Sequence, residues 1–266
     1  MPSFPLSVKQ SLVGTGVGRV LWRARWWAGF LQRTRHPELW DMYLEDQRIE
    51  VALATLVDPD SNCLDIGAHV GSTLSQLARR APDGRHIAIE PGPEKAESLR
   101  QRFPDVRVIT AAVGDEPGIA TFYQARASGY SSLRPPIQHE VTGEIEVEVV
   151  RIDDVVSGEL PIHFVKLDVE GAELPALQGA GDLIKREQPI VMFESGPVGH
   201  TDPFGYNRRD LFDYLDESDY EIYAIVDFVY GRAPMTVDEF EKAGTYPYRG
   251  FNYLALPAGT KIARLL

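Results

Sequence analysis

The sequence predicts an α/β fold in which a mostly parallel β-sheet carries helices on both faces. From residue 61 onward, short apolar segments alternate with segments of helical length, and turns rich in glycine or proline separate them. This alternation is typical of βαβ units, whose right-handed crossovers place helices on both faces of the sheet. The composition agrees, since 44% of the 266 residues are hydrophobic and 25% are charged. A mainly disordered chain is therefore excluded.

The first part of the alternation contains three strands and two helices. We expect strands at Asn62–Ile66, His86–Ile89 and Val106–Val113, and helices at Ser72–Arg80 and Pro93–Phe103. The second helix begins with a proline, whose missing N–H costs nothing in a first helical turn.

Residues 117–156 interrupt this alternation. We expect two strands here, Ala120–Gln124 and Glu144–Val150. The second alternates acidic with aliphatic residues, as an exposed or edge strand does. The composition of Ser128–Pro136, between the two strands, predicts a loop.

The alternation returns in the remainder of the chain. We expect further strands at Ile162–Leu167, Ile190–Phe193, Tyr220–Val226 and Phe251–Leu256, with helices at Ala172–Gln178 and Arg208–Glu217. The last two strands are separated by Asp227–Gly250, for which we expect a long loop.

The beginning of the chain differs in charge from the rest. The formal net charge is −12, yet residues 1–40 hold six basic side chains against one acid, together with all four tryptophans. We expect a basic helical extension at residues 1–44 and a catalytic domain at residues 45–260. The apolar stripe of this extension consists of Val17, Val20, Leu21, Ala24, Trp27, Ala28 and Leu31. We expect this stripe to pack on the domain or to form a homo-oligomer contact, the alternative being weak contact with an anionic membrane surface.

Charge and cysteine content exclude several classes of protein. A net charge of −12 disfavours a general electrostatic grip on nucleic acid. The single cysteine, Cys63, rules out an internal disulfide framework, and the expected localisation is cytoplasmic. No segment approaches the length of about 18 apolar residues that a transmembrane helix needs.

Acidic residues follow four of the expected strands. They are Asp65, Glu90, Asp168 and Glu194. Ligands of open α/β sheets bind beyond the carboxyl ends of the strands, where strand order reverses. We therefore expect these acids to form a polar rim around a ligand site.

The turn after the first strand reads Asp65-Ile-Gly67-Ala-His-Val-Gly71. Its glycines let the backbone approach a ligand without an intervening Cβ. Glu90 follows Gly67 by 23 residues, a spacing at which an acid can accept hydrogen bonds from ribose hydroxyls. The spacing fits dinucleotide and adenosyl cofactors alike. Asp65 favours the second, because it would repel a pyrophosphate and tolerate a cationic amino group with a sulfonium.

These motifs resemble those of a known enzyme family. Asp65-Ile-Gly-Ala-His-Val-Gly resembles motif I of class I S-adenosylmethionine-dependent methyltransferases. The string Lys166-Leu-Asp168-Val-Glu170-Gly171-Ala-Glu173-Leu resembles the FkbM-type methyltransferases, as do Ala112-Val-Gly-Asp115, Ser131-Ser132-Leu133 and Phe193-Glu194. The resemblance covers about residues 45–256.

The resemblance implies a Rossmann-like sheet of seven strands with the last strand antiparallel, and S-adenosylmethionine as the cofactor. It assigns Glu90 to the ribose hydroxyls, the Ala112–Asp115 stretch to the adenine, and Asp168 to the transferable methyl group. The residues expected to bind the cofactor are Asp65, Gly67, Ala68, His69, Gly71, Glu90, Ala112, Val113 and Asp168.

Methylation of a hydroxyl makes its own chemical demands. A sugar hydroxyl is a poor nucleophile at neutral pH and needs a general base, or a metal ion that lowers its pKa. The expected catalytic residues are Asp168, Glu194 and His200. Asp168 and Glu194 could also share a hard divalent metal ion. Glu170 and Glu173 lie in the first turn of a helix, where acids can also act only on the helix dipole.

The expected function is that of an O-methyltransferase. The resemblance implies transfer to a hydroxyl of a sugar, glycolipid or polyketide-type small molecule, with a glycan or glycolipid favoured. The alternatives are a nicotinamide-dependent oxidoreductase and a non-catalytic cofactor-binding scaffold. We expect an acceptor pocket built from Gly129–Pro136, Gly196–Tyr206 and Asp227–Gly250. Their tyrosines, which can stack on sugar rings or simply fix the loops, are Tyr130, Tyr206, Tyr230, Tyr246 and Tyr248.

Overall fold

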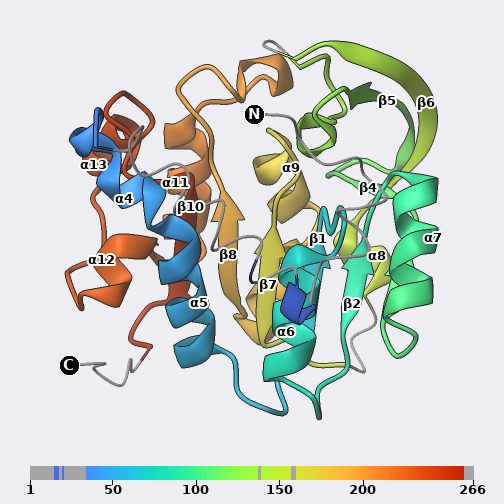
Figure 1. The fold of residues 1–266 in the computed structure, drawn as a ribbon, viewed down its shortest axis with the longest axis horizontal. Helices are drawn as coiled ribbons and strands as arrows, with labels where there is room; N and C mark the ends of the chain where they lie inside the picture. Colours follow the sequence, from blue (N-terminus) through green and yellow to red (C-terminus); the bar gives the residue numbers. More distant parts are fainter. Residues whose placement is uncertain (1–14, 18–19, 21–33, 137–138, 157–159, 261–266) are drawn as a thin grey trace.

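The computed structural model describes residues 15–17, 20, 34–136, 139–156 and 160–260 (Figure 1). Its strands are β1 (Cys63–Ile66), β2 (Ile87–Ile89), β3 (Arg107–Ile109), β4 (Ala112–Val113), β5 (Gly118–Ala125), β6 (Val141–Val150), β7 (Phe164–Leu167), β8 (Ile190–Glu194), β9 (Tyr220–Ala224) and β10 (Asn252–Pro257). Its α-helices are α4 (Trp40–Tyr43), α5 (Glu45–Leu56), α6 (Ser72–Arg80), α7 (Pro93–Arg102), α8 (Ile152–Val155), α9 (Glu173–Gln178), α10 (Gly181–Glu187), α11 (Arg208–Glu217), α12 (Ile225–Val229) and α13 (Val237–Ala243).

Seven strands form one sheet in the order β3-β2-β1-β7-β8-β10-β9. Neighbouring strands pair in parallel from β3 to β8, whereas β10 runs antiparallel to both β8 and β9. The predicted Rossmann-like, mostly parallel sheet with an antiparallel last strand is confirmed. The order also shows that the chain leaves the β1–β2–β3 side and returns beside β1, so strand order reverses between β1 and β7.

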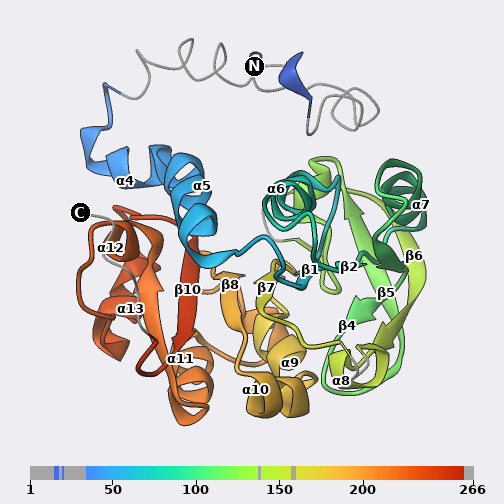
Figure 2. The ribbon, with the colours of Figure 1, turned by 90° about the horizontal axis from the view of Figure 1, so that it is seen from below.

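Helices cover both faces of this sheet, as predicted. Figure 2 shows α5, α6 and α7 over one face and α9, α10 and α11 over the other. Alternate strand residues point to opposite faces. Leu64 and Ile66 therefore pack with Leu177 and Leu211 in one core, while Cys63 packs with Leu77 in the other. Cys63 is fully buried and behaves as a small apolar residue.

A second, three-stranded sheet has the order β4-β6-β5. The prediction of one strand over Val106–Val113 was wrong. β3 ends at Ile109, whose carbonyl accepts the N–H of Glu90. Ala112–Val113 then forms β4, which pairs with β6. Of the two alternatives for Glu144–Val150, an exposed or an edge strand, the structure shows the exposed one, since β6 lies between β4 and β5. Its alternation reflects one solvated face, on which its glutamates are exposed.

The prediction of a long loop at Asp227–Gly250 was wrong as well. α12 begins at Ile225, directly after β9, and α13 forms within the expected loop. α13 begins with a capping box, in which the Thr236 side chain accepts from the Glu239 N–H and the Glu239 side chain accepts from the Thr236 N–H. Phe240 anchors the helix through full burial, which contributes about 1.5–3 kcal/mol.

Most of the predicted apolar stripe of residues 1–44 lies outside the described residues. Of that stripe only Val17 and Val20 are described, and both are exposed. The described part just before residue 45 contacts the domain: Arg249 Nε lies 3.8 Å from Asp41 Oδ2, and the Tyr246 hydroxyl donates to Glu38. The domain boundary at residue 44 stays a prediction. No helix in the described part of the chain is both long and apolar enough to cross a membrane.

Candidate functional site

A cavity of about 680 Å³ lies at the carboxyl ends of β1, β2 and β7. It sits where strand order reverses, which is the usual place for a ligand in an open α/β sheet. Of the residues predicted to bind a cofactor, those that line it are Gly67, His69, Glu90, Ala112, Val113 and Asp168. The others, which do not line it, are Asp65, Ala68 and Gly71.

Glu90 lies at the end of β2 and is almost fully buried. Its two carboxylate oxygens accept the backbone N–H groups of His69 and Gly92, each at 2.9 Å. Lys95, one turn into α7, lies with its Nζ 3.7 Å from Glu90 Oε1. A carboxylate has about four lone-pair sites, so two backbone donors leave it able to accept two more hydrogen bonds. These contacts hold the Glu90 carboxylate at the cavity and leave two of its acceptor positions for a ligand.

The two glycines of the turn after β1 are required by neighbouring protein atoms. A Cβ on Gly67 would lie 1.7 Å from the carbonyl oxygen of Asp168, and one on Gly71 would lie 2.8 Å from both Leu99 and Phe103 atoms. Both glycines also have positive φ, at 76° and 77°. Gly67 thus lets the end of β7 approach β1 closely, and Gly71 lets α6 start against α7.

Asp65 lies within β1, and its side chain lies on the face of the sheet where α6 packs. Its side chain is buried, and the backbone N–H of Leu74 in α6 donates to it, while Oδ2 has no hydrogen-bond partner among the described residues. Burial raises the pKa of Asp65 to about 7, with the Lys166 charge opposing that rise. The structure therefore places Asp65 under the turn rather than in the cavity.

The second sheet supplies the apolar wall of the cavity. Ala112 and Val113 of β4 line it together with Phe122 of β5 and Leu133 of the following segment. All four are buried or half-buried. The cavity thus brings this apolar wall together with the Glu90 carboxylate, a combination that suits a planar base attached to a hydroxylated sugar.

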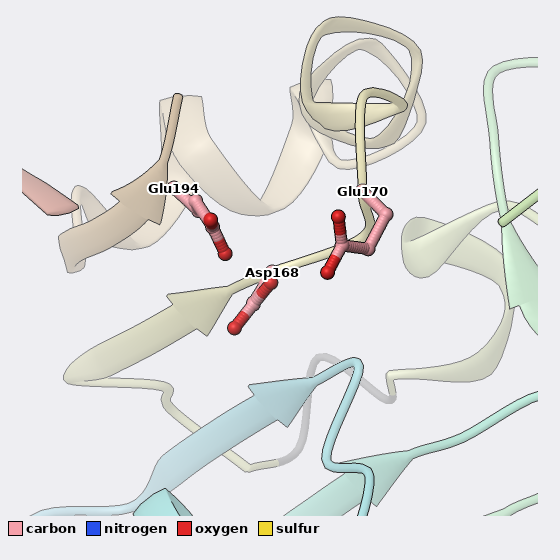
Figure 3. A group of neighbouring side chains, drawn as sticks. All are labelled: Asp168, Glu170 and Glu194. Carbon is pink, nitrogen blue, oxygen red and sulfur yellow. The ribbon is translucent and has the colours of Figure 1, made fainter. Parts of the chain in front are cut away.

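Three carboxyl groups converge at the far side of the cavity (Figure 3). Asp168 follows β7, Glu194 ends β8, and Glu170 lies on the turn that leads to α9. One oxygen from each lies within 4.8 Å of the other two. We call these three residues the acid cluster. Asp168 and Glu170 line the cavity directly.

Lys166 sets the charge state of the acid cluster. Its Nζ is buried and lies 3.4 Å from Asp168 Oδ2. Burial alone would raise the pKa of Asp168, but the Lys166 charge and a hydrogen bond from Glu194 lower it overall. Burial and the Asp168 charge raise the pKa of Glu194 well above its usual value, and they raise the pKa of Glu170 to about 9. At neutral pH the cluster therefore holds an ionised Asp168 and a protonated Glu170, and the Asp168 charge opposes ionisation of Glu194.

Glu173 has a structural role instead. It is fully buried at the start of α9, and its Oε1 accepts the backbone N–H groups of Val169 and Gly171, at 3.3 and 3.2 Å. The Tyr206 hydroxyl donates to the Gly171 carbonyl at 2.7 Å and lies 3.2 Å from Glu173 Oε2. These bonds hold the turn that carries Glu170.

His200 lies beside the acid cluster. Its Nε2 is 3.8 Å from Glu170 Oε2, and burial lowers its pKa although the Asp168 charge opposes this. The predicted catalytic residues Asp168, Glu194 and His200 are thus brought to one place. Of the tyrosines expected in the pocket, only Tyr130 lines a cavity beside the cluster, the neighbouring one that also includes His200. Tyr206 is buried, and the other three lie outside both cavities, in contact with residues such as Glu38, Phe251 and Arg48.

A family model for the methyltransferase FkbM domain matches residues 65–222, which is more than half of the chain. The chain belongs to the FkbM methyltransferase family. The FkbM domain runs from Asp65 in β1 to Ile222 in β9 and includes every residue of the acid cluster. Members of this family are S-adenosylmethionine-dependent methyltransferases, so the predicted adenosyl cofactor is supported and the nicotinamide-dependent oxidoreductase is not.

The chain is similar to several known proteins. Methyltransferase 1 of Beauveria bassiana is 27% identical over 149 residues, covering 46% of this chain and 59% of that protein. The crystal structure of methyltransferase FkbM from Methylobacillus flagellatus is 20% identical with a TM-score of 0.46, covering 75% of this chain and 44% of that one. A TehB-like S-adenosylmethionine-dependent methyltransferase from Corynebacterium glutamicum is 11% identical with a TM-score of 0.41, covering 87% and 97%. The chain spans less than two thirds of the length of the first two relatives.

Two residues of the FkbM domain matter to the site although the sequence did not point to them. Lys95 approaches Glu90 from the start of α7. Its position in the helix that follows Glu90 is the only sequence signal that could have suggested this contact. Arg208 is buried in α11 and donates to the carbonyls of Ser195 and Gly196, at 3.0 and 2.9 Å. It thereby fixes the chain just after Glu194, at the start of the loop that carries His200.

Proposed function

We propose that the protein is an O-methyltransferase that moves a methyl group from S-adenosylmethionine to a hydroxyl of a sugar, glycolipid or polyketide-type small molecule. The strongest support is that Asp168 and Glu170 of the acid cluster line the same cavity as Glu90, and that His200 lies beside Glu170. A hydroxyl acceptor needs a proton acceptor at the reacting end of a cofactor site, and this is where His200 lies.

The lining residues fit S-adenosylmethionine. Glu90 keeps two acceptor positions for the ribose hydroxyls, while Ala112, Val113 and Phe122 offer an apolar wall to the adenine. The ionised Asp168 gives the far side of the cavity a negative potential that suits a sulfonium and an ammonium group. When bound, the cofactor supplies an electrophilic methyl group.

The residues of the acid cluster then divide the remaining tasks. His200 Nε2 takes the proton of the acceptor hydroxyl, because its lowered pKa leaves the imidazole uncharged at neutral pH. Glu170 is protonated at that pH and cannot compete as a base, and burial with the Asp168 charge raises the pKa of Glu194 well above its usual value. Asp168 is ionised, but Lys166 stabilises its charge and makes it a weak base. Asp168 also stabilises the imidazolium that forms, since its charge favours protonated His200.

A methyl-transfer assay tests this proposal directly. We expect S-adenosylhomocysteine to appear when the protein is given S-adenosylmethionine with a panel of sugars, glycolipids and polyketide-type alcohols, and we expect the product to be a methyl ether. Binding of S-adenosylhomocysteine without turnover of any acceptor would favour the cofactor-binding scaffold. Methylation of nitrogen or carbon acceptors alone would contradict the proposal.

Replacement of Glu90 by alanine is expected to weaken S-adenosylhomocysteine binding by at least about 10-fold. The change removes one or two hydrogen bonds to a charged group, each worth about 1.5–3 kcal/mol. Isothermal titration calorimetry measures the effect, and Glu94→Ala is the matched control because Glu94 is an exposed acid at the start of α7. Unchanged affinity in Glu90→Ala would show that the ribose assignment is wrong.

The acid cluster also fits a divalent cation, and we propose Asp168 and Glu194, with Glu170, as its ligands. Carboxylate oxygens are the ligands that Mg²⁺ and Ca²⁺ prefer. Because Glu170 holds a proton at neutral pH, an ion bound there must displace it. The Lys166 charge next to Asp168 opposes binding at any pH.

Affinity for Mg²⁺ is therefore expected to rise as the pH is raised from neutral toward about 9, where Glu170 loses its proton. Calorimetric titration in two buffers with different enthalpies of ionisation measures the protons released. Glu170→Gln should release fewer protons and bind more weakly. Affinity that does not change with pH, or the absence of binding throughout the range, would contradict the metal proposal.

A further inference from the structure

A second cavity, of about 380 Å³, lies next to the first. Its lining contains aromatic and imidazole rings, a guanidinium group and several prolines: Tyr130, His139, His200, Phe204, Arg134 and Pro203 among them. Glu170 lines both cavities, so they meet at the acid cluster. Beside the proposed cofactor cavity, the second one offers room for another molecule.

The segment Gly129–Arg134 forms the wall between the two cavities. Gly129, Ser131 and Leu133 line the first cavity, whereas Tyr130, Ser132 and Arg134 line the second. From Ser131 onward, after a short 3-10 helix at Ser128–Tyr130, the segment is extended, and successive side chains of an extended chain point to opposite sides. The wall therefore presents one set of side chains to each cavity.

This wall is held in place at its centre. Ser132 exchanges backbone hydrogen bonds with Tyr123 of β5, at 2.8 and 3.1 Å, which joins the segment to the edge of the second sheet. The Ser132 hydroxyl also donates to the Glu170 carbonyl at 2.8 Å. The second cavity thus has a fixed position relative to the acid cluster, which a site for the reacting hydroxyl requires.

Arg134 gives the second cavity a cation that no carboxylate neutralises. Its Nε donates to the Pro203 carbonyl at 3.1 Å, and its guanidinium lies 5.5 Å from the centre of the Phe204 ring. Among the described residues no acid forms an ion pair with it. Glu170, the one acid in this lining, faces His200 instead. A guanidinium with free donors is the usual partner of carboxylate and phosphate groups.

The second cavity holds a cation in a chain that is acidic as a whole. The net charge of the protein is −12, so most of its surface repels anions. Arg134 is the one lysine or arginine among the described residues that line the second cavity. Tyr130 and His139, which are stacked at 3.8 Å between ring centres, add flat surfaces against which a sugar ring can lie.

We propose that the second cavity binds the methyl acceptor and that Arg134 selects acceptors that carry a carboxylate or a phosphate group. This inference rests on the proposed O-methyltransferase function and narrows its substrate class. The bound anion sits at Arg134, and the hydroxyl to be methylated faces Glu170 and His200.

Three small probes test the inference: methyl glucopyranoside, which is neutral, methyl glucuronide, which carries a carboxylate, and glucose 1-phosphate. Their dissociation constants are measured by NMR titration of the protein saturated with S-adenosylhomocysteine. We expect at least one anionic probe to bind about 10-fold more tightly than the neutral one, as a hydrogen-bonded ion pair of this kind provides. The carboxylate and phosphate arms show which anion is preferred. Because Arg134 is exposed, the preference should shrink at high ionic strength.

The Arg134→Gln variant should lose this preference and keep the affinity for methyl glucopyranoside. Arg126→Gln is the matched control, since Arg126 lies on the same connection but is paired with Glu140 at 2.7 Å outside the cavity. Equal affinities for all three probes, failure of both anionic probes to bind, or a preference that survives in Arg134→Gln would overturn the inference.

The affinity for S-adenosylhomocysteine, measured in parallel, separates this inference from the proposed function. Wild-type protein that binds S-adenosylhomocysteine and methylates neutral glycosides without any preference for anions would remove the inference and leave the function. Protein that does not bind S-adenosylhomocysteine would remove both.

Discussion

Replacement of His200 by glutamine is expected to lower kcat for methyl transfer by about 10²–10⁴-fold, the usual contribution of a general base. His200 is the uncharged base next to the acid cluster, with its Nε2 3.8 Å from Glu170 Oε2. Glutamine preserves the approximate size and polarity but cannot accept a proton. The affinity for S-adenosylhomocysteine should be unchanged, because His200 does not line the first cavity.

The pH dependence identifies the base more sharply than the rate alone. The base acts when unprotonated, and burial lowers the pKa of His200 below its usual value of 6.5. The rate should therefore be level at neutral pH and fall only as the pH drops through that lowered pKa. His200→Gln should lack this acidic limb. His36→Gln is the matched control, since His36 is exposed, lines neither cavity and should keep the limb. An acidic limb that persists in His200→Gln would move the role of base to Asp168.

The rim of acids could be predicted from the sequence because it depends only on where strands end. Parallel strands bring their carboxyl ends to one edge of a sheet, so an acid after each strand must lie at that edge. Glu90 and Asp168 line the first cavity, and Glu194 lies beside Asp168. Asp65 lies one residue inside β1 and does not line the cavity.

The remaining features depend on contacts between distant segments, which no local pattern encodes. The protonated state of Glu170 arises because burial and two other acids act on it together. The second cavity exists because Gly129–Arg134 pairs with β5 and meets the loop after β8. The composition of Ser128–Pro136 correctly indicated a loop. It did not indicate that successive side chains of this segment line two different cavities. The capping box of α13 is a local pattern, Thr236 followed by Glu239, although we expected a loop there. The anchoring of α13 by Phe240 depends on tertiary packing.

Replacement of Gly67 by alanine is expected to lower the free energy of unfolding by about 3–5 kcal/mol. The new Cβ would lie 1.7 Å from the Asp168 carbonyl oxygen, so β7 and the residues after it would have to move away from β1. Alanine would also be strained at a φ of 76°.

Gly205→Ala separates these two causes. Gly205 has a similar φ of 80°, but nothing lies within 4 Å of an added Cβ, so it should lose only about 1–2 kcal/mol through backbone strain. The difference between the variants, measured by denaturant unfolding, is the cost of separating β1 from β7. Gly67→Ala should also lose methyl transfer, because Asp168 moves with its carbonyl, whereas Gly205→Ala should retain it. Equal stability of the two variants would show that the close approach of β1 to β7 is not what requires a glycine at position 67.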